Sequence, residues 1–97
     1  MSVAPTIRDE RRSERFDVRL GGTIVAADGG RHNAVVRNLS FYGFMAECAL
    51  EVVRGDDVVV EMNSRPAVAA KIAWARDGYM GGAFEAPLTS EELVKLL

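Results

Sequence analysis

An alternation of apolar and polar residues with a period of two constrains this chain more than any other feature of its sequence. In residues 16–20 the apolar side chains alternate with Asp17 and Arg19, and residues 58–63 and 68–74 also keep apolar side chains in one phase. Successive side chains of a β-strand point to opposite faces of the sheet, so such runs predict half-buried strands. Because 97 residues enclose only one modest core, we expect a single all-β domain.

Turn signals divide the chain into short predicted strands. The expected strands are residues 16–26, 31–39, 43–49, 58–63, 67–76 and 79–85. The pair Gly21–Gly22 marks a bulge or a bend within the first strand, and Asp77–Gly78 is a hairpin signal between the last two. Short strands with turns roughly every 8 to 12 residues predict an antiparallel barrel or sandwich.

The end of the chain predicts a short helix. Pro87 ends the sheet region, Thr89 is the expected N-cap, and Glu92 stands at the capping-box position. The helix that follows to Leu97 is too short to persist alone, so we expect it to dock on the barrel or on a partner.

The charges of the chain are balanced, but its cations are nearly all arginine. Twelve basic against fourteen acidic residues leave a net charge of -2, and ten of the twelve basic residues are Arg. This balance argues against a DNA- or RNA-binding protein held by bulk positive charge. Arginine instead offers a planar fork of donors that pairs with phosphate or guanine and also stacks on a base.

The residue types that catalysis or metal binding requires are scarce. The single histidine, His32, lies beside a Gly-rich turn, and the single cysteine, Cys48, has no second cysteine for a disulfide or a zinc site. No run of residues has the apolar length of a signal peptide or a membrane span. We therefore expect a cytoplasmic protein that is not an enzyme, needs no metal or cofactor and does not insert into a membrane.

Two short motifs stand out. Arg11 and Arg15 form an Arg-x-x-x-Arg motif, although about one such spacing arises by chance among ten arginines. The second motif is Asn38-x-Ser40-x-x-Gly43, for which this composition predicts roughly 0.04 chance matches. An ordinary strand corner, in which Asn and Ser bond the local backbone and Gly takes a positive φ, is the alternative to a ligand site.

The order of these features along the chain resembles the PilZ domain family. The two motifs, with one strand hairpin between them, are followed by residues 72–76, a turn at Gly78 and residues 81–85, which look like the last two strands of that family. The resemblance implies a six-stranded antiparallel β-barrel followed by a helix, in agreement with the strands predicted above. It also implies a bacterial signal-transduction receptor for the second messenger cyclic di-GMP.

The resemblance gives the N-terminal arginines a role toward that ligand. Residues 1–15 are polar and lack a sustained period, so we expect a flexible arm ahead of a barrel domain at residues 16–97. Arg11 and Arg15, with Arg12 as a lesser candidate, would fold over cyclic di-GMP. Each guanidinium would then meet a phosphate, a guanine edge or a base face.

The second motif would act from the barrel surface. By the resemblance, Asn38 and Ser40 would hydrogen-bond the edge of a guanine, and Gly43 would let the backbone come close to the ligand. The family allows Asp or Asn at the first position, and Asn38 keeps an acceptor oxygen without the formal charge. Trp74 is a further candidate for stacking, although its phase with Ile72 predicts a place in the core, and Arg37 would add positive potential.

A domain of this size has no output of its own, so the resemblance implies a downstream effector protein that reads the ordering of the arm. The alternative function is a PilZ-like adaptor that binds a protein partner without nucleotide, through Phe41, Tyr42 and the terminal leucines. A small barrel that binds nucleic acid through the arm is a second alternative, which the acidic pI of about 5.3 disfavours.

Overall fold

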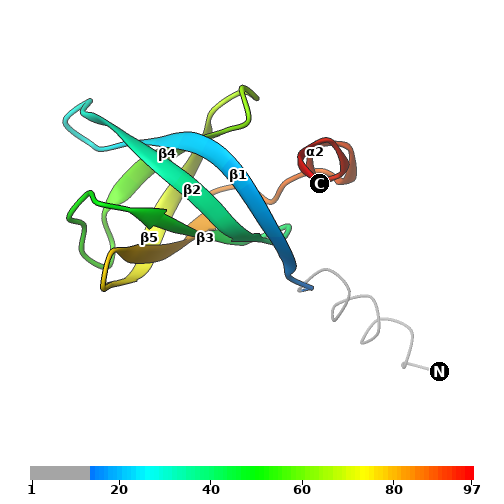
Figure 1. Ribbon diagram of the computed structural model, residues 1–97. Coiled ribbons are helices and arrows are strands. Elements are labelled where there is room, and N and C mark those ends of the chain that lie inside the picture. Colours follow the sequence, from blue (N-terminus) through cyan, green and yellow to red (C-terminus); the bar gives the residue numbers. More distant parts are fainter. Residues whose placement is uncertain (1–13) are drawn as a thin grey trace.

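The computed structural model describes residues 14–97, which form a closed β-barrel with one short helix beside it (Figure 1). The elements are β1 (Phe16–Val25), β2 (Arg31–Leu39), β3 (Gly43–Cys48), β4 (Asp57–Met62), β5 (Val68–Arg76), β6 (Tyr79–Phe84) and α2 (Ser90–Leu96). Neighbouring strands pair antiparallel in the order β1-β2-β3-β6-β5-β4, and β4 returns to β1 to close the ring. The prediction of a six-stranded antiparallel barrel followed by a helix is confirmed.

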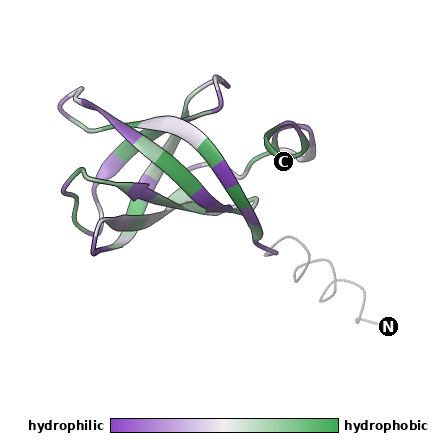
Figure 2. Ribbon diagram, viewed as in Figure 1, coloured by the Kyte–Doolittle hydropathy of each residue, from purple (hydrophilic) through white to green (hydrophobic). Residues whose placement is uncertain are grey.

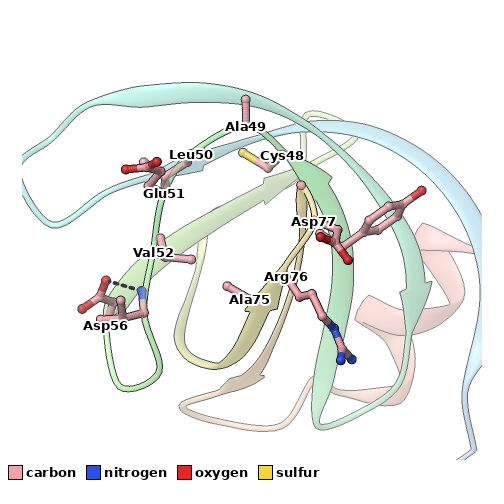
Figure 3. A pocket seen from close by; sticks show the side chains of 12 residues that line it. Cys48, Ala49, Leu50, Glu51, Val52, Asp56, Ala75, Arg76 and Asp77 are labelled. Atoms are coloured by element: carbon pink, nitrogen blue, oxygen red, sulfur yellow. Dashed lines mark hydrogen bonds between the residues drawn. The ribbon is translucent and has the colours of Figure 1, made fainter.

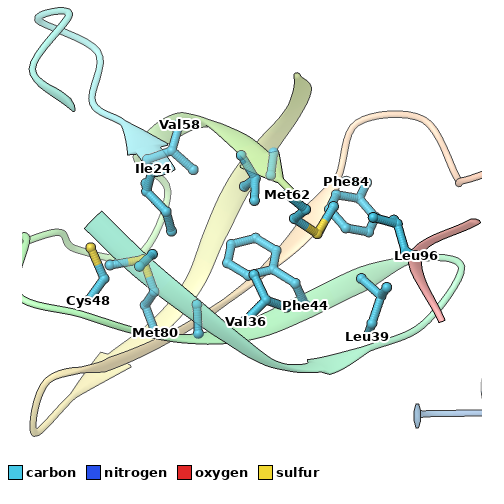
Figure 4. Packing of buried hydrophobic residues seen from close by; sticks show 14 of the residues in the cluster. Ile24, Val36, Leu39, Phe44, Cys48, Val58, Met62, Met80, Phe84 and Leu96 are labelled. Carbon is cyan, nitrogen blue, oxygen red and sulfur yellow. The ribbon is translucent and has the colours of Figure 1, made fainter. Parts of the chain in front are cut away.

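The alternating residues place one face of each strand in a single core. Apolar and polar residues alternate along the strands (Figure 2), and the apolar ones gather inside the barrel (Figure 4). The most deeply buried include Ile24, Val36, Leu39, Val60 and Met62, each at most 1% exposed. Burial of this apolar surface is the main favourable term that holds the strands together.

Helix α2 closes one end of this core. The Thr89 hydroxyl accepts a hydrogen bond from the Glu92 backbone N–H at 3.1 Å, and the Glu92 carboxylate accepts one from the Thr89 N–H at 2.8 Å, as the capping box predicts. Leu93 and Leu96 are buried, and Figure 4 shows Leu96 at the edge of the cluster. The short helix therefore docks on the barrel. In the described part of the chain, α2 falls short of the length that a membrane span requires.

The alternation of core-facing and outward-facing side chains is interrupted within β2. The register of β2 against β3 shifts between Val36 and Asn38, which is the signature of a β-bulge. Val36 and Leu39 consequently both lie in the core although they are three positions apart. The two residues between them, Arg37 and Asn38, are left outside it.

The bulge predicted at Gly21–Gly22 lies elsewhere in β1. The register of β1 against β2 shifts between Asp17 and Leu20, whereas both glycines pair with β2 in continuous register. Gly22 is required for another reason, because a β-carbon at this position would overlap the backbone carbonyl oxygen of Glu61 in β4. The missing side chain lets β1 approach β4 where the barrel closes.

A further bulge corrects the prediction for Trp74. The register of β5 against β6 shifts between Ile72 and Trp74, so the core phase of Val68, Ala70 and Ile72 ends at Ile72. Trp74 is 41% exposed and lies on the outer surface of the barrel. The prediction from its phase with Ile72, that Trp74 lies in the core, is therefore wrong.

We expect Gly22→Ala to lower the free energy of unfolding by about 1–3 kcal/mol, because the added methyl group must displace the backbone of β4. Gly21→Ala is the matched control, since a β-carbon there meets nothing within 4 Å. The control should leave stability unchanged or raise it by up to about 1 kcal/mol. Urea unfolding of both variants measures the difference, and equal stabilities would contradict this role of Gly22.

Candidate ligand-binding site

One row of directly paired residues crosses five strands on the outer face of the barrel. Asp17 of β1 pairs with Asn38 of β2, Asn38 pairs with Met45 of β3, Met45 pairs with Gly81 of β6, and Gly81 pairs with Trp74 of β5. Residues directly opposite each other lie on the same face of a sheet. This row, called here the Asp17–Trp74 row, therefore places a carboxylate, an amide, a thioether and an indole side by side along the outer face of the curved sheet.

A depression of about 260 Å³ adjoins the row and shares Trp74 with it. Its lining residues are Arg15, Ser40, Tyr42, Gly43, Phe44, Ala73, Trp74, Gly82 and Ala83. Residues of both motifs thus meet here, because Arg15 comes from the Arg-x-x-x-Arg motif and Ser40 and Gly43 come from the corner between β2 and β3. Asn38 does not line the depression and stands on the row beside it.

Ser40 holds the corner between β2 and β3. Its hydroxyl oxygen accepts hydrogen bonds from the backbone N–H groups of Tyr42 at 3.2 Å and Gly43 at 3.1 Å. The Ser40 backbone N–H donates to the carbonyl oxygen of Gly43 at 2.9 Å. The side chain is almost buried and satisfies two backbone donors, so it has the structural role that the alternative to a ligand site predicted.

Gly43 serves strand packing in this fold. Among the described glycines, those with positive φ are Gly29, Gly55 and Gly78, so a positive φ does not explain Gly43. A β-carbon at Gly43 would instead overlap the backbone carbonyl oxygen of Gly82 in β6. Both glycines line the depression.

Asn38 and Arg37 each pair with an acidic side chain. The Asn38 amide nitrogen donates to Asp17 Oδ1 at 3.3 Å, across the directly opposed pair of β1 and β2. The Arg37 guanidinium bonds the Glu47 carboxylate at 3.0 Å, so part of its positive potential is neutralised by this ion pair. Asp17 was missed by sequence reasoning, because its place opposite Asn38 depends on the register of the two strands.

The Trp74 indole lies across the neighbouring strand. A β-carbon built on Gly81 would overlap Nε1 of the indole and would lie 2.9 Å from Cζ2. Gly81 is consequently buried beneath an exposed ring. The bulge in β5 therefore supplies an accessible aromatic face at the edge of the depression.

The arm motif is only partly within the described residues. Arg15 is exposed and immediately precedes β1. Arg11 and Arg12 lie outside the described residues, as does most of the predicted flexible arm at 1–15.

A larger hollow of about 650 Å³ lies at the other end of β3 (Figure 3). It is lined by residues 48–53 and by the β5–β6 hairpin at 75–79, together with Asp56. The Asp56 carboxylate accepts the Val53 backbone N–H at 3.0 Å, which is the bond drawn in Figure 3. The second motif and Arg15 are absent from its lining, so size alone does not mark the candidate site.

Two ion pairs on the exposed surface, outside the depression, raise the pKa of their basic side chains. A hydrogen bond to Glu61 at 2.7 Å raises the pKa of Arg31, and a hydrogen bond to Asp57 at 2.8 Å raises the pKa of Lys71. Within residues 14–97 no group of three or more His, Cys, Asp or Glu side chains is placed to hold a metal ion. The candidate site therefore offers hydrogen bonding, positive charge and an aromatic face.

We expect Ser40→Ala to lower the free energy of unfolding by about 1–3 kcal/mol, because two backbone N–H groups lose their acceptor. Ser90→Ala is a suitable control, since Ser90 is exposed at the start of α2. Its effect should stay within about 0.5 kcal/mol. Thermal unfolding compares the two variants, and a Ser40→Ala protein as stable as the control would contradict the structural role of this hydroxyl.

We expect Gly81→Ala to displace the Trp74 ring, because the new methyl group occupies the space of the indole. Trp74 is the only tryptophan of the chain, so its fluorescence spectrum and its quenching by acrylamide report the change directly. Gly21→Ala, which adds a methyl group in open space, should leave both signals as in the wild type. Identical spectra for Gly81→Ala and the wild type would contradict the packing of the ring on Gly81.

The comparisons with known proteins agree with this fold. The family model of the PilZ domain matches residues 9–97. A crystal structure of the PilZ domain of CeSA from a cellulose-synthesizing bacterium is similar, with a TM-score of 0.68 and 17% sequence identity, over 84% of this chain and 89% of that chain. At this identity the structural likeness shows the fold alone. The comparison with curated proteins finds no match.

Proposed function

The chain belongs to the PilZ domain family, and on this basis we propose that it is a bacterial receptor that binds cyclic di-GMP and relays the signal to a partner protein. The family is known for receptors of this second messenger. The observation that carries the proposal is the depression in which Arg15 meets Ser40, Gly43 and Trp74. These residues come from three separate parts of the chain, and the fold brings them to one surface.

The chemistry of the depression suits a cyclic dinucleotide. A guanidinium pairs with phosphate or with guanine O6 and N7, and it also stacks on a base. An exposed indole stacks on a purine, as at other sites that bind unpaired bases. Arg15 and Trp74 supply these two groups at one depression, while Asn38 on the adjoining row offers a hydrogen bond to a base edge.

We assign Arg11 and Arg12 to the same ligand through the arm motif, with Arg12 the lesser of the two. Arg15 precedes β1 directly, so the chain before it starts at the rim of the depression. In the proposal, residues 1–15 order over the bound ligand and replace one surface of the barrel with another. A cytoplasmic effector protein reads that change, and the domain itself carries out no chemistry.

The corner of the second motif is also hydrogen-bonded to the C-terminal segment. In the proposal, this contact transmits ligand binding at the corner to α2. The Leu88 backbone N–H donates to the carbonyl oxygen of Phe41 at 2.8 Å, and Leu88 immediately precedes the N-cap of α2. Val94 and Leu97 are exposed on α2, at 70% and 57%. A partner that docks on this helix would sense a shift of the corner.

We expect isothermal titration calorimetry to detect cyclic di-GMP binding, with an affinity that Arg15→Ala weakens roughly 5- to 150-fold, the range for loss of one bidentate arginine contact to guanine. Arg11→Ala should act similarly. Arg54→Ala is the matched control, because Arg54 is exposed and does not line the depression. It should bind as the wild type does.

Absence of heat with cyclic di-GMP at concentrations up to about 100 μM would refute the receptor function and leave the nucleotide-independent adaptor. Normal affinity in both Arg11→Ala and Arg15→Ala would refute the role of the arm while leaving the receptor function in place.

A further inference from the structure

We propose that Asp17 is a positioning residue of this site, which orients the side-chain amide of Asn38 and thereby selects guanine over adenine. The proposal rests on the proposed function, since it concerns how the same surface reads the base of its ligand. It adds to that site a residue that lies in neither sequence motif.

The contact between the two side chains sets the orientation of the amide. The Asn38 amide nitrogen donates to Asp17 Oδ1 at 3.3 Å, and the two residues are directly opposed across β1 and β2. An ionised carboxylate only accepts hydrogen bonds, so Asn38 must turn its NH₂ group toward Asp17. Its carbonyl oxygen is then the group directed away from Asp17 and available to a ligand.

The backbone holds this pair in place. A bulge lies beside each member, between Asp17 and Leu20 in β1 and between Val36 and Asn38 in β2. The neighbours Phe16 and Leu39 are directly opposed and belong to the core side, with Leu39 0% exposed. Asp17 and Asn38 are therefore fixed on the outer face by a packed pair directly beside them.

The charge of Asp17 also accounts for the amide at position 38. A second carboxylate there would stand directly opposite Asp17, and like charges in directly opposed positions destabilise a sheet. An amide avoids this repulsion and keeps an acceptor oxygen. In this chain the negative charge and the acceptor for the base are thus divided between two strands.

The orientation of the amide decides which base it fits. The Watson–Crick edge of guanine presents the N1–H and N2 amino donors, whereas adenine presents the acceptor N1 at the corresponding place. A fixed carbonyl oxygen at Asn38 matches guanine and opposes adenine N1. An amide free to turn could instead offer its NH₂ group to adenine, so loss of Asp17 should reduce the discrimination between the two bases.

The remainder of the Asp17–Trp74 row carries the indole on the outer face of the same sheet. Two strands, β3 and β6, separate Asn38 from Trp74, and neighbouring strands are about 4.8 Å apart. The indole already reaches across β6, over Gly81. The oriented acceptor and the aromatic ring are thus three strand spacings apart, about 14 Å along the sheet, so we expect them to meet different parts of the dinucleotide.

The test compares the affinities of the full chain for cyclic di-GMP and cyclic di-AMP, by calorimetry, in the wild type, Asp17→Asn and Asp77→Asn. Asp77→Asn removes the same charge from the exposed β5–β6 hairpin, where its φ of 55° suits asparagine. We expect Asp17→Asn to lower the ratio of guanine to adenine affinity about tenfold, within the range for one base contact, and Asp77→Asn to leave it unchanged.

A double variant that exchanges the two side chains, Asp17→Asn with Asn38→Asp, tests the contact between them. Asn38→Asp alone opposes two carboxylates and should bind cyclic di-GMP more weakly than the wild type. Combined with Asp17→Asn, it restores one carboxylate and one amide, and the double variant should bind more tightly than Asn38→Asp alone.

A second measurement examines the contact in the ligand-free protein. The side-chain NH₂ signals of Asn38 in the ¹H–¹⁵N spectrum should shift in Asp17→Asn and stay in place in Asp77→Asn.

The outcomes separate this proposal from the receptor function. An unchanged affinity ratio in Asp17→Asn, or an equal loss of affinity for both dinucleotides, overturns the positioning role while the receptor function stands. A wild type that binds neither dinucleotide overturns the receptor function and the base selection that rests on it. In that case unchanged NH₂ signals in Asp17→Asn would show separately that the contact itself is absent.

Discussion

Closure of the strand ring is the constraint on which the rest of this structure depends. The barrel closes where β1 meets β4, and Gly22 permits that approach because any side chain there would overlap the backbone of Glu61. In the described part of the chain every strand has a neighbour on both sides, although β4 pairs with only residues 22–25 of β1 and residues 68–71 of β5. The paired parts of these strands have no free edge, so recognition there depends on side chains, loops or α2.

The bulges expose side chains that a regular alternation would turn toward the core. In an unbroken strand every second residue faces the core, so Asn38 and Trp74 would each be placed by a simple alternation. The bulge in β2 leaves both Arg37 and Asn38 outside, and the bulge in β5 takes Trp74 out of the core phase. β-bulges commonly re-aim side chains beside functional sites. Here they lie beside the polar and the aromatic ends of one row.

The strands and the helix could be predicted because their signals are local. Alternation identified β4, and the spacing of Thr89 and Glu92 identified the start of α2. The bulges could not be predicted, because a register shift depends on the partner strand, and Trp74 was consequently assigned to the core face. The contact of Asp17 with Asn38 was missed for the same reason. Ser40 and Gly43 were identified by their motif, but the backbone contacts that they serve appear only in the assembled corner.

The hydrogen bonds at the corner restrict what Ser40 can offer to any ligand. A hydroxyl has one donor hydrogen and two acceptor lone pairs, and both lone pairs of Ser40 are directed to the N–H groups of Tyr42 and Gly43. Its hydrogen has only the Gly43 carbonyl oxygen at 3.5 Å, a long and weak contact. A ligand atom that bonds Ser40 in this conformation must therefore be an acceptor, such as a phosphate oxygen or guanine O6. In the proposed site the base donors would be left to Asn38, and the two polar residues of the motif would contact ligand groups of opposite hydrogen-bonding polarity.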